Sequence, residues 1–107
     1  MSDEPTEINE NGTKIWRNSQ GKKHRSEDKP AVICINGDCF WLRNGYYHRD
    51  NNLPAIIWPD IYTCKWYQNG IKIKEKQCTK EEIEEYKRPY YQQKKFVKFN
   101  RFEKLIK

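Results

Sequence analysis

The side chains best suited to chemistry in this sequence are two histidines, His24 and His48, and four cysteines. A histidine can serve as a general base or a metal ligand. Each histidine here precedes an arginine inside a repeated segment, and no serine or cysteine stands in a nucleophile motif. The sequence also lacks a glycine-rich loop of the kind that binds phosphate. We therefore expect no catalytic residues, no cofactor and no enzymatic activity.

The cysteines, at positions 34, 39, 64 and 78, follow no usual zinc-binding spacing, so we expect no metal site. The sequence begins with acidic residues, and no apolar run approaches the roughly 20 residues that cross a bilayer. We therefore expect an intracellular, reducing compartment and free thiols. A two-residue turn at Asn36-Gly37 would place Cys34 opposite Cys39, close enough for a disulfide under oxidation.

The 107-residue chain is long enough for one domain, and its net charge of +6 is concentrated at one end. From Lys87 onward there are eight basic residues and one acid, which leaves a net charge of −1 on residues 1–86. Such a basic segment suits a phosphate, an anionic membrane surface or an acidic protein. The expected contacts to an anionic partner are Lys87, Arg88, Lys94, Lys95, Lys98, Arg101 and Lys104.

A repeat of 24 or 25 residues runs through the first seventy positions. Its recurring residues are Trp16, Trp41 and Trp66, spaced by 25, and His24 with His48 and Pro30 with Pro54, spaced by 24. Asn-Gly dipeptides at 36–37, 44–45 and 69–70 are strong signals for hairpin turns. The pattern predicts an antiparallel meander with strands near 13–17, 21–25, 31–35, 38–43, 46–49, 54–58, 62–67 and 71–75.

The repeated residues have predicted structural roles. A turn at Asn44-Gly45 places Trp41 opposite His48, so we expect the histidine to stack on the indole as a cross-strand pair. Because proline has no N–H to donate, the repeated prolines should begin strands. The repeated arginines, Arg25 and Arg49, each precede acidic residues. Two interpretations stay open for them: a local ion pair, or a row of arginines for an anionic ligand.

The block W-x-x-N-G-x-x-H-R followed by P-A, clearest at residues 41–57, resembles the MORN-repeat variant of short proteins from amoeba-infecting giant viruses and of bacterial proteins described as antitoxins. The likeness covers roughly residues 11–75. It implies a single elongated sheet of stacked hairpins that contacts proteins or lipids, without catalytic residues. The sequence departs from the pattern in three places: residues 18–20 lengthen one turn, residues 59–61 replace an expected Asp-Gly, and the third copy lacks its His-Arg.

The periodicity changes after Thr79. Thr79 and Glu82 form a capping box, which predicts a helix that ends near Arg88 because a proline follows. A second, basic amphipathic helix is expected from about 90 to 105, with Phe96 and Phe99 on its apolar side. This helix could cover one face of the sheet, or its basic side could bind an acidic partner, and the two alternatives are compatible.

These features predict a mainly β fold, an antiparallel meander of stacked β-hairpin repeats in a single elongated sheet with a C-terminal α-helical cap. Residues 1–10 are expected to be a flexible acidic N-terminus, 11–76 the repeat domain and 79–107 the basic helical segment. We expect a non-catalytic protein-interaction or structural module, which the resemblance extends to a minor virion component with capsid or virion proteins as partners. Two alternatives stay open: a nucleic-acid-associated protein that binds through its basic tail, and an antitoxin-like inhibitor of a partner protein. Binding of the tail to a membrane surface is the weaker option.

Overall fold

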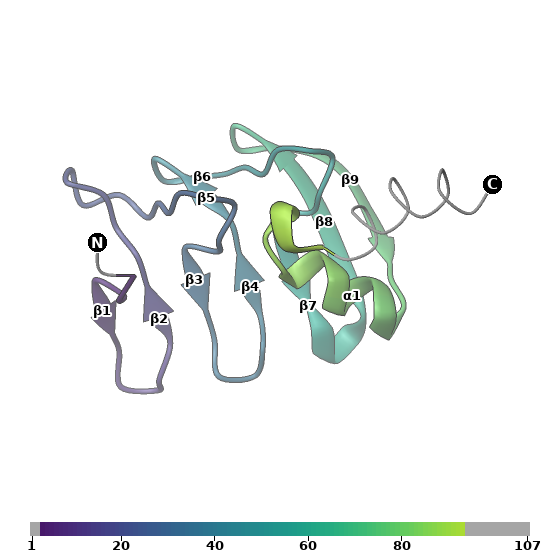
Figure 1. Cartoon of the computed structure of the whole chain (residues 1–107), viewed down its shortest axis with the longest axis horizontal. Coiled ribbons are helices and arrows are strands. Elements are labelled where there is room, and N and C mark those ends of the chain that lie inside the picture. Colours follow the sequence, from purple (N-terminus) through teal and green to yellow (C-terminus); the bar gives the residue numbers. More distant parts are fainter. Residues whose placement is uncertain (1–2, 94–107) are drawn as a thin grey trace.

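The computed structural model describes residues 3–93, which form a mainly β fold with one short α-helix. Seven strands build one antiparallel sheet in the order β1-β2-β3-β4-β7-β8-β9, and β5 pairs separately with β6 (Figure 1). The bounds are β1 Glu7–Ile8, β2 Lys14–Ile15, β3 Val32–Ile33, β4 Cys39–Phe40, β5 Leu42–Arg43, β6 Tyr46–Tyr47, β7 Ile56–Trp58, β8 Thr63–Gln68 and β9 Ile71–Gln77. The predicted antiparallel meander with a C-terminal helical cap is therefore confirmed.

The Asn-Gly turns at 44–45 and 69–70 lie along one edge of the molecule, and the turn between β3 and β4 lies at the opposite edge (Figure 1). At 44–45 and at 69–70 both turn residues have positive φ, which is the conformation that a two-residue hairpin turn requires. The Gly45 N–H donates to the Lys23 carbonyl, and the Gly70 N–H donates to the Tyr47 carbonyl. Each turn is thus fastened to the preceding one, so the repeat continues in space as it does in sequence.

The turn near Asn36-Gly37 differs from its prediction. Cys34 donates its N–H to the carbonyl of Asp38, and Ile33 pairs with Cys39, so the loop has three residues instead of two. A shift of one residue in register moves a side chain to the other face of a sheet. Cys34 consequently packs with one apolar cluster and Cys39 with another, and the predicted pairing of the two thiols is wrong.

Two segments near the N-terminus also differ from their predictions. Residues 21–25 form no strand, and only a single bridge joins Arg17 to Lys23. Glu7 and Ile8, expected in a flexible tail, instead form β1 and pair with β2. The reason is that β3 pairs with only one edge of β2. The N–H and C=O groups on the other edge can pair with a short extended segment.

The helix α1, Lys80–Lys87, begins as predicted. The Thr79 hydroxyl accepts the Glu82 N–H, the Glu82 carboxylate accepts the Thr79 N–H, and the helix ends before Pro89. A short 3₁₀ helix, Tyr90–Gln92, follows. The remainder of the predicted second helix lies outside the described residues.

α1 covers the C-terminal half of one sheet face (Figure 1). The face is defined by one row of directly paired residues: Ile8, Lys14, Ile33, Cys39, Ile57 and Cys64. Ile83 of α1 is buried against the last three of these. Of the first three, Ile8 is 60% exposed and Lys14 is exposed, whereas Ile33 is partly buried at the margin of the cluster that contains Ile83. We call the first three residues the open end of the face.

Candidate functional site

The most elaborate polar site surrounds Arg49, whose side chain is only 1% exposed. Its guanidinium lies 3.9 Å over the Trp41 ring, donates to the Asp28 carboxylate at 2.8 and 3.0 Å, and donates to the Pro54 carbonyl at 3.2 Å. The Trp41 indole N–H donates to the Asp28 carbonyl at 3.0 Å. We call Asp28, Trp41, Arg49 and Pro54 the Arg49 unit.

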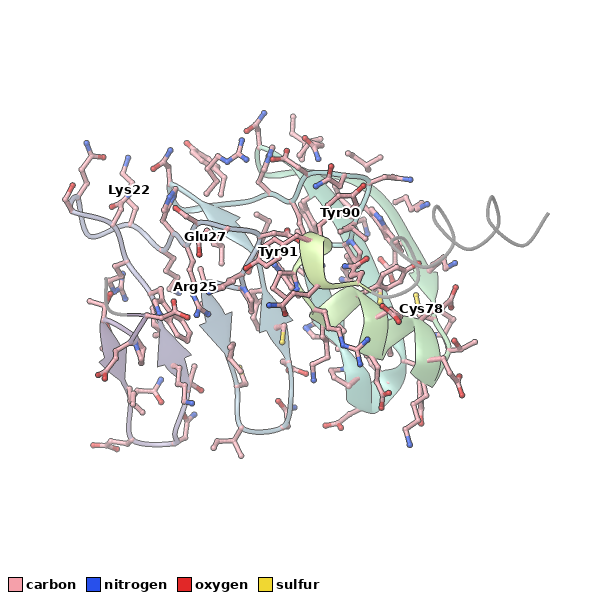
Figure 2. The ribbon with its side chains drawn as sticks, in the orientation of Figure 1. Lys22, Arg25, Glu27, Cys78, Tyr90 and Tyr91 are labelled. Carbon is pink, nitrogen blue, oxygen red and sulfur yellow. The ribbon has the colours of Figure 1, made fainter. Side chains whose placement is uncertain are left out.

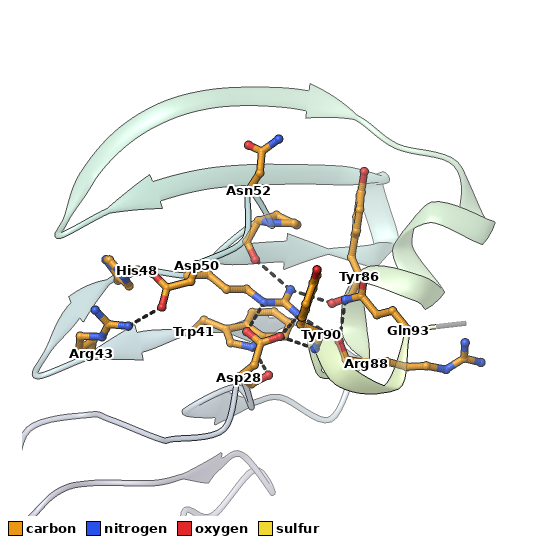
Figure 3. Close-up of polar contacts among 12 residues, drawn as sticks. Asp28, Trp41, Arg43, His48, Asp50, Asn52, Tyr86, Arg88, Tyr90 and Gln93 are labelled. Atoms are coloured by element: carbon orange, nitrogen blue, oxygen red, sulfur yellow. Dashed lines mark hydrogen bonds and ion pairs between the residues drawn. The ribbon is translucent and has the colours of Figure 1, made fainter. Parts of the chain in front are cut away.

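Arg49 also binds the chain that leaves α1. Its two terminal nitrogens donate to the carbonyls of Tyr86 at 2.7 Å and Arg88 at 3.0 Å (Figure 3). Asp28 in turn accepts the N–H of Tyr90. With these bonds all five N–H groups of the guanidinium have an acceptor. The sheet therefore holds residues 86–90 through their main-chain atoms.

Burial and charge work against each other at Arg49. Removal from water disfavours the charged guanidinium and lowers its pKa, and the hydrogen bond that it donates to Asp28 opposes that effect. A buried charge of this kind is stable only while its partners satisfy it. The Arg49 unit is therefore suited to holding residues 86–90 on the sheet, and every N–H group of the guanidinium already donates to an acceptor within the protein.

The same constellation occurs one repeat earlier. Arg25 lies 3.7 Å over the Trp16 ring, pairs with Asp3 at 2.9 Å, and donates to the Pro30 carbonyl at 3.1 Å. The Trp16 indole N–H donates to the Asp3 carbonyl at 3.2 Å. We call Asp3, Trp16, Arg25 and Pro30 the Arg25 unit. Hydrogen bonds from Arg25, and secondly from Lys29, lower the pKa of Asp3.

A third, incomplete copy closes the series. The Trp66 indole N–H donates to the Asn52 carbonyl at 2.9 Å, and Lys74 lies 4.5 Å over the ring. Lysine here replaces the repeated arginine, and asparagine replaces the repeated aspartate. Each tryptophan thus bonds to the loop of the preceding repeat, so the motif joins successive repeats.

The repeated histidines have a different role from the predicted one. The register that places Trp41 opposite His48 is confirmed, but the group stacked on the indole is Arg49. His48 Nδ1 accepts the N–H of Asn69 at 3.0 Å, and His24 Nδ1 accepts the N–H of Asn44 at 3.0 Å. Each histidine therefore caps the turn of the next repeat.

His48 also reaches an acid. Because its Nδ1 is an acceptor, its proton lies on Nε2, which donates to Asp50 at 2.9 Å. Asp50 also pairs with Arg43 at 2.8 Å. These contacts, chiefly that of His48, lower the pKa of Asp50. The three residues line an open groove of about 280 Å³ between the Arg25 and Arg49 units.

Both interpretations of the arginines change. The predicted local ion pairs are wrong, because Arg25 pairs with Asp3 and Arg49 pairs with Asp28, each more than twenty residues earlier. An anionic ligand cannot use Arg49, because no N–H group remains for it. Asp3 and Asp28 are the site residues that the sequence reasoning missed. Their signal was a further recurrence, since each lies 13 residues before a repeated tryptophan.

The remaining predicted residues are placed as follows. Pro30 and Pro54 precede β3 and β7 by two residues, and the alanine after each donates the first ladder hydrogen bond. Arg88 pairs with Glu85 at 3.2 Å, and Lys87 lies beside the Gly37 turn. The other residues predicted for an anionic partner lie outside the described part of the chain: Lys94, Lys95, Lys98, Arg101 and Lys104.

The thiols form no disulfide among the described residues. All four cysteines are free, and burial raises the pKa of Cys39 to about 11 and raises that of Cys64 further. Residues 3–93 contain no group of three or more His, Cys, Asp or Glu side chains that could hold a metal ion. No helix within that range combines the length and apolar character of a membrane span.

Comparisons with protein families, curated proteins and solved structures found no match for this chain. The resemblance to MORN-repeat variants therefore stays a prediction that rests on the repeated sequence motif.

Proposed function

We propose that this protein is a non-catalytic interaction module that binds other proteins on the sheet face that carries α1. The observation that supports it most directly is the Arg49 unit, which holds residues 86–90 by two carbonyls and one N–H. Recognition through main-chain atoms transfers readily to a segment of another chain. The resemblance to MORN-repeat variants supports the same class of function.

The exposed surface supports this proposal as well. On the face that carries α1, Ile8 is 60% exposed and Ile33 is partly exposed, directly beside the charged side chain of Lys14. An apolar patch with a charged neighbour is typical of a surface that contacts a protein partner. The paired strands hold these side chains in fixed positions, so a partner would meet a preformed surface.

Affinity capture with the tagged full-length protein from cells that produce it tests the proposal. We expect a protein partner that the wild type retains and that Ile8→Glu loses. Ile61→Glu is the matched control, since Ile61 is 57% exposed and lies in the connection between β7 and β8. If neither the wild type nor any variant retains a protein, the proposal is wrong. Identification of the partner would also separate a virion role from an antitoxin role.

A second candidate function is nucleic-acid binding, and the observation that favours it is charge. Residues 94–107 contain six basic residues and one acid. A salt titration of DNA and RNA binding tests it, because affinity should fall with a log–log slope of about −0.9 per phosphate contacted. Binding weaker than about 10⁻⁴ M at physiological salt would end this candidate.

A further inference from the structure

We propose that the Arg25 unit, together with the open end of the face, is a second docking site for a protein segment. The segment it fits is an acidic amphipathic helix that continues into a short extended stretch, which is the chemistry of α1 and residues 86–90. This inference rests on the proposed function and names the site and the kind of partner.

The two arginine units contain the same kinds of partner, a tryptophan ring, an aspartate and a proline carbonyl. The indole-to-carbonyl bond is 3.2 Å at Trp16 and 3.0 Å at Trp41. The guanidinium lies 3.7 Å from one ring and 3.9 Å from the other, and the bond to the proline carbonyl is 3.1 Å in one unit and 3.2 Å in the other. One of these units binds a peptide segment, so the other has the same groups for the purpose.

The Arg25 unit has donors and acceptors left over. Nη1 and Nη2 of Arg49 each make one bond inside their own unit and one to a carbonyl of residue 86 or 88, whereas within residues 3–93 Nη1 of Arg25 bonds to Pro30 and Nη2 bonds to Asp3. The Asp3 side chain is 60% exposed, compared with 15% for Asp28. Figure 2 shows Arg25 in the N-terminal half of the sheet, away from α1. The second N–H groups on Nη1 and Nη2 of Arg25 can therefore donate to two carbonyls, and the Asp3 carboxylate can accept one N–H.

The sheet surface under α1 has a counterpart one repeat earlier. Ile83 of α1 packs on a row in which Ile57 pairs with Cys39 and Cys64. One repeat earlier the equivalent row has Ile33 paired with Lys14 and Cys39. An aliphatic side chain can contact Ile33 in the same way. Lys14, which is exposed, replaces a buried cysteine, so this row favours a helix with acidic residues nearby.

The spacing also fits. One repeat advances the sheet by two strands, and neighbouring strands lie about 4.8 Å apart. A helix bound to the Arg25 unit in the same manner would lie about 9.6 Å from α1. Packed helices are separated by about 8–10 Å, so a docked helix would contact α1 as well as the sheet.

The probe is a synthetic peptide with the sequence of residues 79–93, titrated into the isotope-labelled full-length protein. The readout is the indole N–H signals of the four tryptophans, assigned with single Trp→Phe variants. We expect the Trp16 signal to shift in a saturable manner while the Trp41 signal stays in place. Shifts of Trp41 alone would mean exchange with α1, and would overturn the proposal.

Two variants and one control test the contacts that are proposed for the docked segment. Lys14→Glu should weaken peptide binding by about tenfold, since it reverses a charge beside the docked helix. Lys22→Glu makes the same charge change at an exposed turn residue and should leave binding unchanged. Arg25→Gln should also weaken binding by about tenfold or more, with the thermal melt showing that the variant is folded. If Lys14→Glu and Lys22→Glu have equal effects, the proposal is wrong.

Absence of binding up to millimolar peptide would also overturn the proposal. The proposed function can survive that result. A captured partner whose retention is insensitive to Lys14→Glu and Arg25→Gln would support the interaction module and reject this docking site.

Discussion

Replacing Arg49 with glutamine should destabilise the protein much more than replacing Arg25 with glutamine. The two arginines have equivalent tryptophan, aspartate and proline partners, but the Arg49 side chain is 1% exposed and the Arg25 side chain 12%. Asp28 is 15% exposed and Asp3 is 60% exposed. Breaking a buried ion pair costs about 3–5 kcal/mol, whereas a pair with an exposed partner contributes about 0–1 kcal/mol.

The expected difference is therefore about 3 kcal/mol in the free energy of unfolding, a large share of the roughly 5–15 kcal/mol that stabilises a domain of this kind. Urea unfolding followed by tryptophan fluorescence measures it, with the slope against urea checked for constancy. In a thermal melt the Arg49 variant should lose at least about 12 °C, since a small domain loses about 4–8 °C per kcal/mol.

A double-mutant cycle isolates the pair from its surroundings. Asp28→Asn, Arg49→Gln and the double variant should give a coupling energy of about 2 kcal/mol, and the cycle through Asp3 and Arg25 should give a clearly smaller coupling energy. Equal losses for the two arginine variants would refute the reasoning, because burial would then not decide what each unit contributes.

Three further outcomes are expected. Trp41→Ala should cost about 3–5 kcal/mol in urea unfolding, because the side chain is 2% exposed and stacks under a guanidinium; a cost below 1 kcal/mol would count against that packing. The pKa of Asp50 lies below its ordinary value of 3.8, chiefly because of His48, so its contribution to stability is present above about pH 4 and lost as the pH falls through the lowered pKa. Asp50→Asn should therefore flatten the acid side of a melting-temperature profile below about pH 4, and an unchanged profile would contradict this. Iodoacetamide at about pH 8 should modify the half-buried Cys34 before the buried Cys39, because burial raises the pKa of Cys39 to about 11. Mass spectrometry that finds Cys39 modified first would contradict this order of reactivity.

Much of the fold could be predicted because its determinants are local. The turns at 44–45 and 69–70 require positive φ at two successive positions. Asn-Gly adopts this conformation, and few other dipeptides do. The capping box at Thr79 and Glu82 joins residues three apart, so the start of α1 followed from the sequence alone. The prediction of a two-residue turn at Asn36-Gly37 was wrong. The same dipeptide also suits a three-residue loop, and nothing local distinguishes the two loop lengths.

The arginine units could not be derived in the same way. Arg25 and Arg49 are followed by nearby acids, which made a local ion pair the natural expectation. Their actual partners, Asp3 and Asp28, lie in the preceding repeat and are brought close only by the stacking of hairpins. The role of the histidines was hidden for the same reason, since each caps a turn that lies about twenty residues later.

Arg49 fastens residues 86–90 to the sheet through their main-chain carbonyls, and this contact is central to the proposed function. Hydrogen exchange followed by mass spectrometry, comparing the wild type with Arg49→Lys, tests it most directly. Lysine keeps the charge but loses the planar fork that reaches Asp28, Tyr86 and Arg88 together. We expect exchange in residues 80–93 to become at least about tenfold faster, with a smaller change in β8 and β9. Unchanged exchange in residues 80–93 would contradict the claim.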